Sequence, residues 1–172
     1  MINLSKKDKL LLFIMFYYLI PIIYIYTHYE NNNAVSNIIC SNDCKSIILF
    51  SMIAMSCIVI LYELQRYNII PFVSILFLLV GCNGLILFDE TTMTHYFMTI
   101  IVFISILGFM NFYSYTMNIS ILWILFGLQY IFLSIILYYI HATIFYGEVA
   151  FILNFGVFYI ILHFVEPLNV KS

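Results

Sequence analysis

The sequence predicts an all-α fold, a polytopic transmembrane bundle of six helices with both termini cytoplasmic. Two observations indicate this fold class. Hydrophobic residues make up 65% of the 172 residues and charged residues only 8%, whereas soluble domains are about 45–50% apolar and about 25% charged. The apolar residues also occur in long runs between the few charges. This composition excludes a soluble globular enzyme, because too few polar side chains are present to cover an aqueous surface.

The apolar runs define six expected spans. A helix needs roughly 20 apolar residues to cross about 30 Å of hydrocarbon. We expect one transmembrane domain over residues 1–172, with helices at about 10–26, 46–64, 67–88, 96–117, 120–140 and 142–164. The runs do not alternate apolar and polar residues, as the strands of an outer-membrane barrel would.

The basic residues predict the orientation of the spans. Lys and Arg accumulate in cytoplasmic loops. With a cytoplasmic N-terminus, five basic residues lie inside and one, Lys45, lies outside. The five are Lys6, Lys7, Lys9, Arg66 and Lys171. Because six spans return the chain to its starting side, both termini are expected in the cytoplasm.

Charge also limits the expected partners. Six basic residues and a net charge of −2 provide no basic surface for nucleic acid. Membrane lipids are the expected partners, and other membrane proteins form a second class. No cofactor is predicted.

Polar side chains gather on the non-cytoplasmic face in this topology. Asp89 and His95 stand at the outer ends of the third and fourth spans, and His141 and Glu148 stand at the outer end of the sixth. Such a carboxylate–imidazole cluster could hold zinc and activate water for lipid hydrolysis. Because no two ligands have metal-binding spacing on one helical face, we favour interfacial helix capping, with no metal and no catalytic residue.

Glu148 is expected one turn inside the sixth span, where an ionisable side chain is a candidate functional residue. We expect it to face the bundle and to bond to a polar group of another helix, with Asn83, His95 and backbone carbonyls as candidate partners. Asn154 lies on the same helix, about 120° around the axis from Glu148, and is a further polar candidate.

Two shorter patterns have structural interpretations. Cys40 and Cys44 in the first outer loop are a candidate disulfide on the oxidising side of the membrane, and two free thiols are the alternative. Gly81 and Gly84 are expected to let two helices approach closely, as small residues do in membranes.

Three segments of the chain carry a family resemblance. The stretch LVGCNGLILFDETTMTHYF includes Gly81, Gly84, Phe88 and His95, the stretch YGEVAFILNFGVFYIILHF includes Glu148, and LYELQRYN closes the second span. Together they resemble the DRAM-type membrane proteins, the damage-regulated autophagy modulators of the DRAM/FRAG/SFK group. Asp89 stands where that family has an amide.

The resemblance implies a non-enzymatic modulator of autophagy, lysosomal or lipid homeostasis that acts through lipid or partner contacts. It implies an endomembrane location, in the lysosome or Golgi, or the plasma membrane. Glu148 and His95 would then be structural or lipid-contacting points. Two alternatives remain: an intramembrane metal-dependent lipid hydrolase using the outer-face His, Asp and Glu residues, and an accessory subunit of a larger membrane complex.

The orientation can be tested with a reporter that is active only in the cytoplasm. We expect activity when the reporter is fused to either end of the chain, because an even number of spans places both ends on one side. Activity at one end alone requires an odd number of spans and contradicts the prediction.

Overall fold

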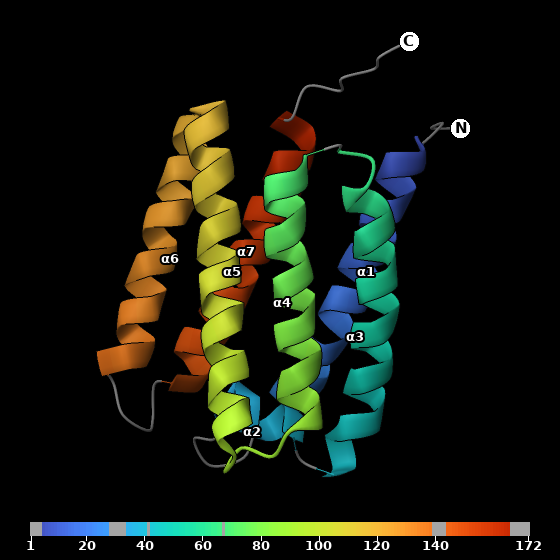
Figure 1. Cartoon of the computed structure of the whole chain (residues 1–172), viewed down its shortest axis with the longest axis vertical. Helices are drawn as coiled ribbons and strands as arrows, with labels where there is room; N and C mark the ends of the chain where they lie inside the picture. The colour runs from blue at the N-terminus through green and yellow to red at the C-terminus, as the bar shows by residue number, and fades with distance from the viewer. Residues whose placement is uncertain (1–4, 28–33, 41, 67, 139–143, 166–172) are drawn as a thin grey trace.

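Six long helices and one short helix form the described part of the chain, which contains no strand (Figure 1). The structure is a computed structural model that describes residues 5–27, 34–40, 42–66, 68–138 and 144–165. The helices are α1 (Lys6–Thr27), α2 (Val35–Cys40), α3 (Asn42–Glu63), α4 (Ile69–Leu87), α5 (Met93–Met117), α6 (Ser120–Tyr138) and α7 (Ile144–Val165).

The six long helices are long and apolar enough to cross a membrane, and the all-α prediction is confirmed for the described residues. Within the bundle, only 22% to 44% of each helix's apolar window is buried. The remaining apolar surface faces outward, which is unfavourable in water by roughly 25 cal/mol per Å² but suits a hydrocarbon surrounding. The chain is therefore a multi-pass integral membrane protein.

The bundle has two ends that differ in what closes them. α1 begins and α7 ends at one end, which we call the terminal end, and α2 lies across the opposite end, which we call the α2 end (Figure 1). α1 packs against α3, α3 against α4 and α4 against α5, while α6 packs on the outside against α5 and α7. Five helices, α1, α3, α4, α5 and α7, therefore surround the interior.

The short helix α2 is absent from the sequence-based prediction, which treats this segment as a turn-rich loop. Its apolar residues Val35, Ile38 and Ile39 are buried at the i, i+3, i+4 spacing of one helical face. They pack against Ile48 of α3 and Ile86 of α4 in one apolar cluster. This packing stabilises a helix that is too short to be stable alone.

Small residues set the distance between α4 and α5. A Cβ atom on Gly81 would lie 2.8 Å from Val102 Cγ2 and 3.2 Å from the Met98 carbonyl oxygen. A Cβ atom on Gly84 would lie 2.7 Å from Met98 Cγ. Both glycines therefore lie at the closest approach of these two helices, where a larger residue would push the helices apart.

The connection between α5 and α6 is short because of one left-handed residue. Asn118 has φ 49° and ψ 40°, and its N–H donates to the carbonyl of Ser114. Asn tolerates this conformation better than most residues, and the arrangement is a common helix ending. As a result, α6 starts two residues later as the antiparallel neighbour of α5.

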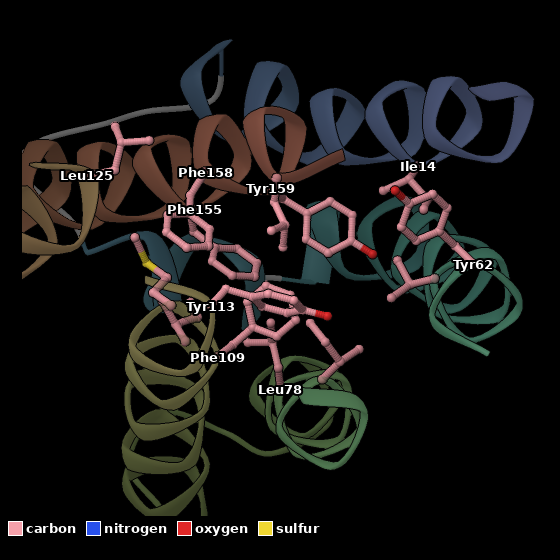
Figure 2. Close-up of a cluster of buried hydrophobic side chains, with 14 of the residues drawn as sticks. Ile14, Tyr62, Leu78, Phe109, Tyr113, Leu125, Phe155, Phe158 and Tyr159 are labelled. Carbon is pink, nitrogen blue, oxygen red and sulfur yellow. The ribbon is translucent and has the colours of Figure 1, made fainter. Parts of the chain in front are cut away.

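Aromatic side chains fill the interior between α5 and α7 (Figure 2). Phe109 lies at the centre, stacked on Tyr159 with ring centroids 5.8 Å apart and edge-on to Phe155 at 5.8 Å. Its other ring contacts are with Tyr113 at 5.0 Å and Phe158 at 6.5 Å. Such pairs add about 0.5–1.5 kcal/mol beyond their burial, and they fix the spacing of the two helices.

Pro21 lies inside α1 and is buried. Proline has no N–H, so the carbonyl of Tyr17, four residues earlier, loses its helical donor. The Ser51 hydroxyl of α3 donates to this oxygen at 3.0 Å. A neighbouring helix thereby satisfies a carbonyl that hydrocarbon cannot satisfy, which is how membrane helices tolerate proline.

Thermal or denaturant unfolding in detergent can measure this compensation as a double-mutant cycle. Ser51→Ala is expected to lower the free energy of unfolding by about 1 kcal/mol in the native chain. In a Pro21→Ala background, Ser51→Ala should lower the free energy of unfolding by less, because the restored N–H of residue 21 can donate to the Tyr17 carbonyl. Ser134→Ala, which removes an exposed bond to the Tyr130 carbonyl, should show no coupling. Equal costs of Ser51→Ala in both backgrounds would contradict the mechanism.

Candidate functional site

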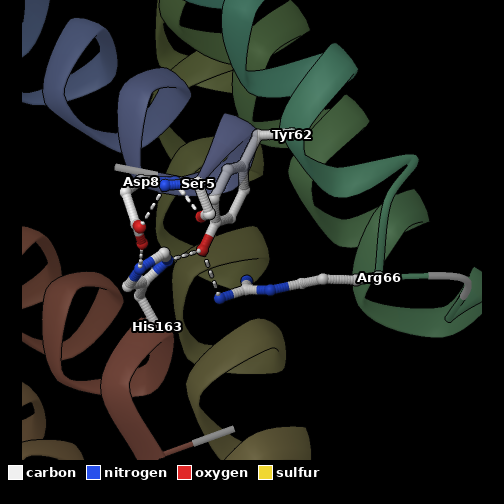
Figure 3. Close-up of polar contacts among 5 residues, drawn as sticks. All are labelled: Ser5, Asp8, Tyr62, Arg66 and His163. Carbon is white, nitrogen blue, oxygen red and sulfur yellow. Dashed lines mark hydrogen bonds and ion pairs between the residues drawn. The ribbon is translucent and has the colours of Figure 1, made fainter. Parts of the chain in front are cut away.

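A charged cluster closes the terminal end of the bundle. It joins α1, α7 and the end of α3 with its following turn, and Figure 3 shows part of it. Its members are Asp8, Tyr62, Glu63, Arg66, Tyr159 and His163.

The centre of the charged cluster is a buried ion pair. The side chains of Arg66 and Glu63 are 0% and 1% exposed, and Arg66 Nη1 donates to Glu63 Oε1 at 2.8 Å. The Tyr159 hydroxyl donates to the same oxygen. The guanidinium carbon also lies 4.8 Å, 5.5 Å and 5.1 Å from the ring centroids of Tyr62, Tyr113 and Tyr159. These contacts offset the cost of burying two charges.

A chain of hydrogen bonds leads from this ion pair to α1. Arg66 Nη2 donates to the Tyr62 hydroxyl at 3.3 Å, Tyr62 contacts His163 Nδ1 at 2.6 Å, and His163 Nε2 contacts Asp8 Oδ1 at 2.9 Å. Arginine can only donate and a carboxylate can only accept. His163 Nε2 therefore carries a proton and donates to Asp8, and a hydrogen bond joins Nδ1 to the Tyr62 hydroxyl.

The first turn of α1 holds Asp8 in place. The Ser5 N–H donates to Asp8 Oδ2 at 2.9 Å, and the Asp8 N–H donates to Ser5 Oγ at 3.1 Å (Figure 3). This reciprocal pair is a capping box that satisfies two backbone donors at the helix start. It aims Asp8 at His163, so the beginning of α1 is bound to the end of α7.

Sequence reasoning missed the charged cluster and treated its charges only as topological markers. Glu63 and Arg66 are three residues apart at the end of a span, a spacing at which opposite charges meet on a helix. That spacing is the signal that could have identified the pair. The contacts to Asp8 and His163 have no local signal, because 155 residues separate these two positions.

An apolar cavity of about 190 Å³ lies between the five inner helices, and we call it the central cavity. Its lining residues on α3, α4 and α7 run from 48 to 59, from 75 to 86 and from 148 to 159. Eleven residue steps of 1.5 Å make it roughly 16 Å deep. This depth is about half of the ~30 Å hydrocarbon core, or one leaflet.

The wall of the central cavity presents hydrocarbon because its hydroxyl groups donate elsewhere. Tyr18 donates to the Ile152 carbonyl, and Thr99 donates to the His95 carbonyl at 3.0 Å. Tyr159 lines the cavity at the terminal end and donates to Glu63 of the charged cluster. Tyr159 therefore forms the floor of the cavity and joins it to the charged cluster.

Glu148 lines the central cavity at the α2 end. Its Oε2 accepts the backbone N–H of Val35 at 2.5 Å. The expected bond to another helix therefore exists, and its partner is a backbone N–H rather than the Asn83 side chain. Asn83 donates to Ser56 Oγ at 3.2 Å and to the Leu79 carbonyl at 2.7 Å. The partner is the first residue of α2, a helix that the sequence-based prediction lacks.

The other outer-face candidates do not join Glu148. His95 is buried and its Nδ1 contacts the Phe88 carbonyl at 3.1 Å, so the ring ties the start of α5 to the end of α4. Asp89 is exposed in the connection between these helices, and His141 lies outside the described residues. Within the described ranges, no group of three or more His, Cys, Asp or Glu side chains could hold a metal ion.

Asn154 lies between α6 and α7 and lines no part of the described cavity wall. It donates to the Leu125 carbonyl at 2.8 Å and to Gln129 Oε1, and Gln129 Nε2 donates to the Phe151 carbonyl at 3.0 Å. These bonds hold α6 on the outside of the bundle. The side chains of Cys40 and Cys44 lie outside the described part of the structure, so the disulfide stays a prediction.

The geometry thus offers a volume for hydrocarbon between Tyr159 and the Glu148 carboxylate, and it offers no convergent set of catalytic groups among the described residues. Comparisons with protein-family models, with curated proteins and with solved structures find no match for this chain.

The burial of the ion pair predicts the effect of removing one partner. Glu63→Ala should lower the free energy of unfolding by about 3–5 kcal/mol, because Arg66 then keeps a buried charge without its carboxylate. Glu90→Ala, at an exposed position of the α4–α5 connection, should change it by less than about 0.5 kcal/mol. Unfolding in detergent is the measurement, and equal effects would show that water solvates the ion pair.

Proposed function

We propose that this protein is a non-enzymatic membrane protein that holds the hydrocarbon chain of a lipid in its central cavity. The observation that carries the proposal is the cavity itself, with an apolar wall about one leaflet deep. A lipid-binding bundle of this kind suits the modulation of lipid homeostasis that the DRAM resemblance implies. On the same resemblance, we propose an endomembrane or plasma-membrane location and a role in autophagy or lysosomal function.

The cost of an empty cavity supports the proposal. The side chains around an unfilled apolar volume lack partner atoms on one side and lose those dispersion contacts. Water does not repay this cost, because apolar cavities of similar size stay dry and bind small apolar molecules. A hydrocarbon chain restores the lost dispersion contacts. Lipid chains surround a multi-pass membrane protein on all sides and are therefore the available occupant.

No described contact favours the two alternative functions. A metal-dependent hydrolase needs ligands that converge, whereas Asp89 is exposed and the ring of His95 is bound to the Phe88 carbonyl. An accessory subunit needs a surface shaped for a partner, and the outward apolar side chains suit lipid equally well.

Two cysteines provide a matched test. Cys82 lines the central cavity, whereas Cys57 is exposed on the outer face of α3. Cys82→Phe should fill the cavity and reduce binding of a probe, tetradecanol, at least about tenfold. It should also raise the stability of the protein by about 0.5–2 kcal/mol, as cavity filling commonly does. Cys57→Phe should leave probe binding unchanged, because its ring points into detergent or lipid.

Binding is measured by native mass spectrometry of the full chain in mild detergent, and stability by thermal unfolding. The stability measurement separates a filled cavity from an unfolded protein. If Cys82→Phe and Cys57→Phe bind tetradecanol equally well, the central cavity is not the binding site and the proposed function is wrong.

A further inference from the structure

We infer that the ligand of the central cavity is a single-chain lipid amine, whose protonated amino group pairs with Glu148. This inference rests on the proposed function and adds the chemical class of the ligand's polar end. It follows from the charge, position and hydrogen bonding of Glu148 relative to the cavity wall.

Among the described residues that line the central cavity, Glu148 alone carries a formal charge. It lies one turn inside α7, which begins at Ile144, at the α2 end of the cavity. Its carboxylate therefore stands where the apolar wall meets the end of the bundle. A chain that fills the cavity from this end places its polar group beside Glu148.

The terminal end of the cavity suits the polar group of the ligand less than the α2 end does. There the cavity ends at Tyr159, whose hydroxyl donates to Glu63, and Glu63 accepts from Arg66. Glu63 and Arg66 do not line the cavity, so a chain inside it does not reach their charges. The methyl end of a chain suits that floor, because it requires no hydrogen bond.

The chemistry of a carboxylate selects the polar group. Glu148 Oε2 accepts the neutral N–H of Val35, and a carboxylate also accepts hydrogen bonds from charged donors. An ammonium group offers three donors and a positive charge, so it makes the stronger, charge-assisted kind of bond. A fatty acid or a phosphate at this position would meet a like charge in a poorly screened environment.

The size of the central cavity limits the ligand to one chain. A volume of about 190 Å³ and a depth of roughly 16 Å suit a single slender chain rather than a paired-chain phospholipid. The fitting class is therefore a long-chain amine without a phosphate.

The test compares three probes with the same hydrocarbon chain: tetradecylamine, tetradecanol and tetradecanoic acid. We expect the native chain to bind the amine about tenfold more tightly than the alcohol, and the acid most weakly. Glu148→Gln should remove the preference for the amine over the alcohol. The amide oxygen can still accept from Val35, and thermal unfolding checks that the variant is folded. Glu90→Gln, an exposed change of the same charge, should keep the preference.

The outcomes separate the two proposals. Equal binding of amine, alcohol and acid by the native chain overturns the inference and leaves the proposed function intact. An amine preference that survives Glu148→Gln also overturns the inference, provided that alcohol binding shows the variant to be folded. If that variant loses alcohol binding, the affinities of the native chain for the three probes decide. Equal affinities overturn the inference, and a preference for the amine supports it. Failure of every probe to bind overturns both proposals.

Discussion

The buried ion pair between Glu63 and Arg66 is the interaction on which the terminal end of the bundle depends. Two opposite charges in a low-dielectric interior are stabilised when they face each other and make further polar contacts. That requirement draws Tyr159 of α7 to Glu63 and places three tyrosine rings around Arg66. The relay through Tyr62 and His163 then reaches α1. The beginning of α1, the end of α3 and the end of α7 are thereby held together at the terminal end of the bundle.

The same constraint explains the other polar contacts inside the bundle. Hydrocarbon cannot satisfy a donor or acceptor, so each buried polar group must find its partner in the protein. Ser51 compensates for Pro21, Asn154 and Gln129 join α6 to α7, and Glu148 accepts from α2. These bonds link helices whose surfaces are otherwise uniformly apolar. Polar side chains therefore specify which helices meet, while dispersion and packing supply much of the attraction.

The central cavity results from unequal spacing of the helices. Gly81 and Gly84 bring α4 and α5 into close contact, whereas aromatic rings around Phe109 separate α5 from α7. Tyr18 reaches from α1 to the Ile152 carbonyl of α7 and bridges the remaining gap. α4 packs closely on α5 and α1 on α3, whereas α7 makes few contacts with α1 and α5, and this leaves a volume that no described side chain fills. Its walls are apolar because the polar bonds lie at its two ends and at the helix backbones.

The sequence by itself determined the class of protein and the positions of its spans, because hydropathy is a local property of the chain. It also identified Gly81, Gly84 and Glu148 as residues with a role inside the bundle. Only the tertiary structure decided which helix faces meet, since helices that are apolar on all sides carry no periodic signal for their inner face. The pairing of Asp8 with His163, the choice of Val35 as partner of Glu148, and the central cavity all depend on that arrangement. They join residues distant in sequence, and for that reason local patterns could not reveal them.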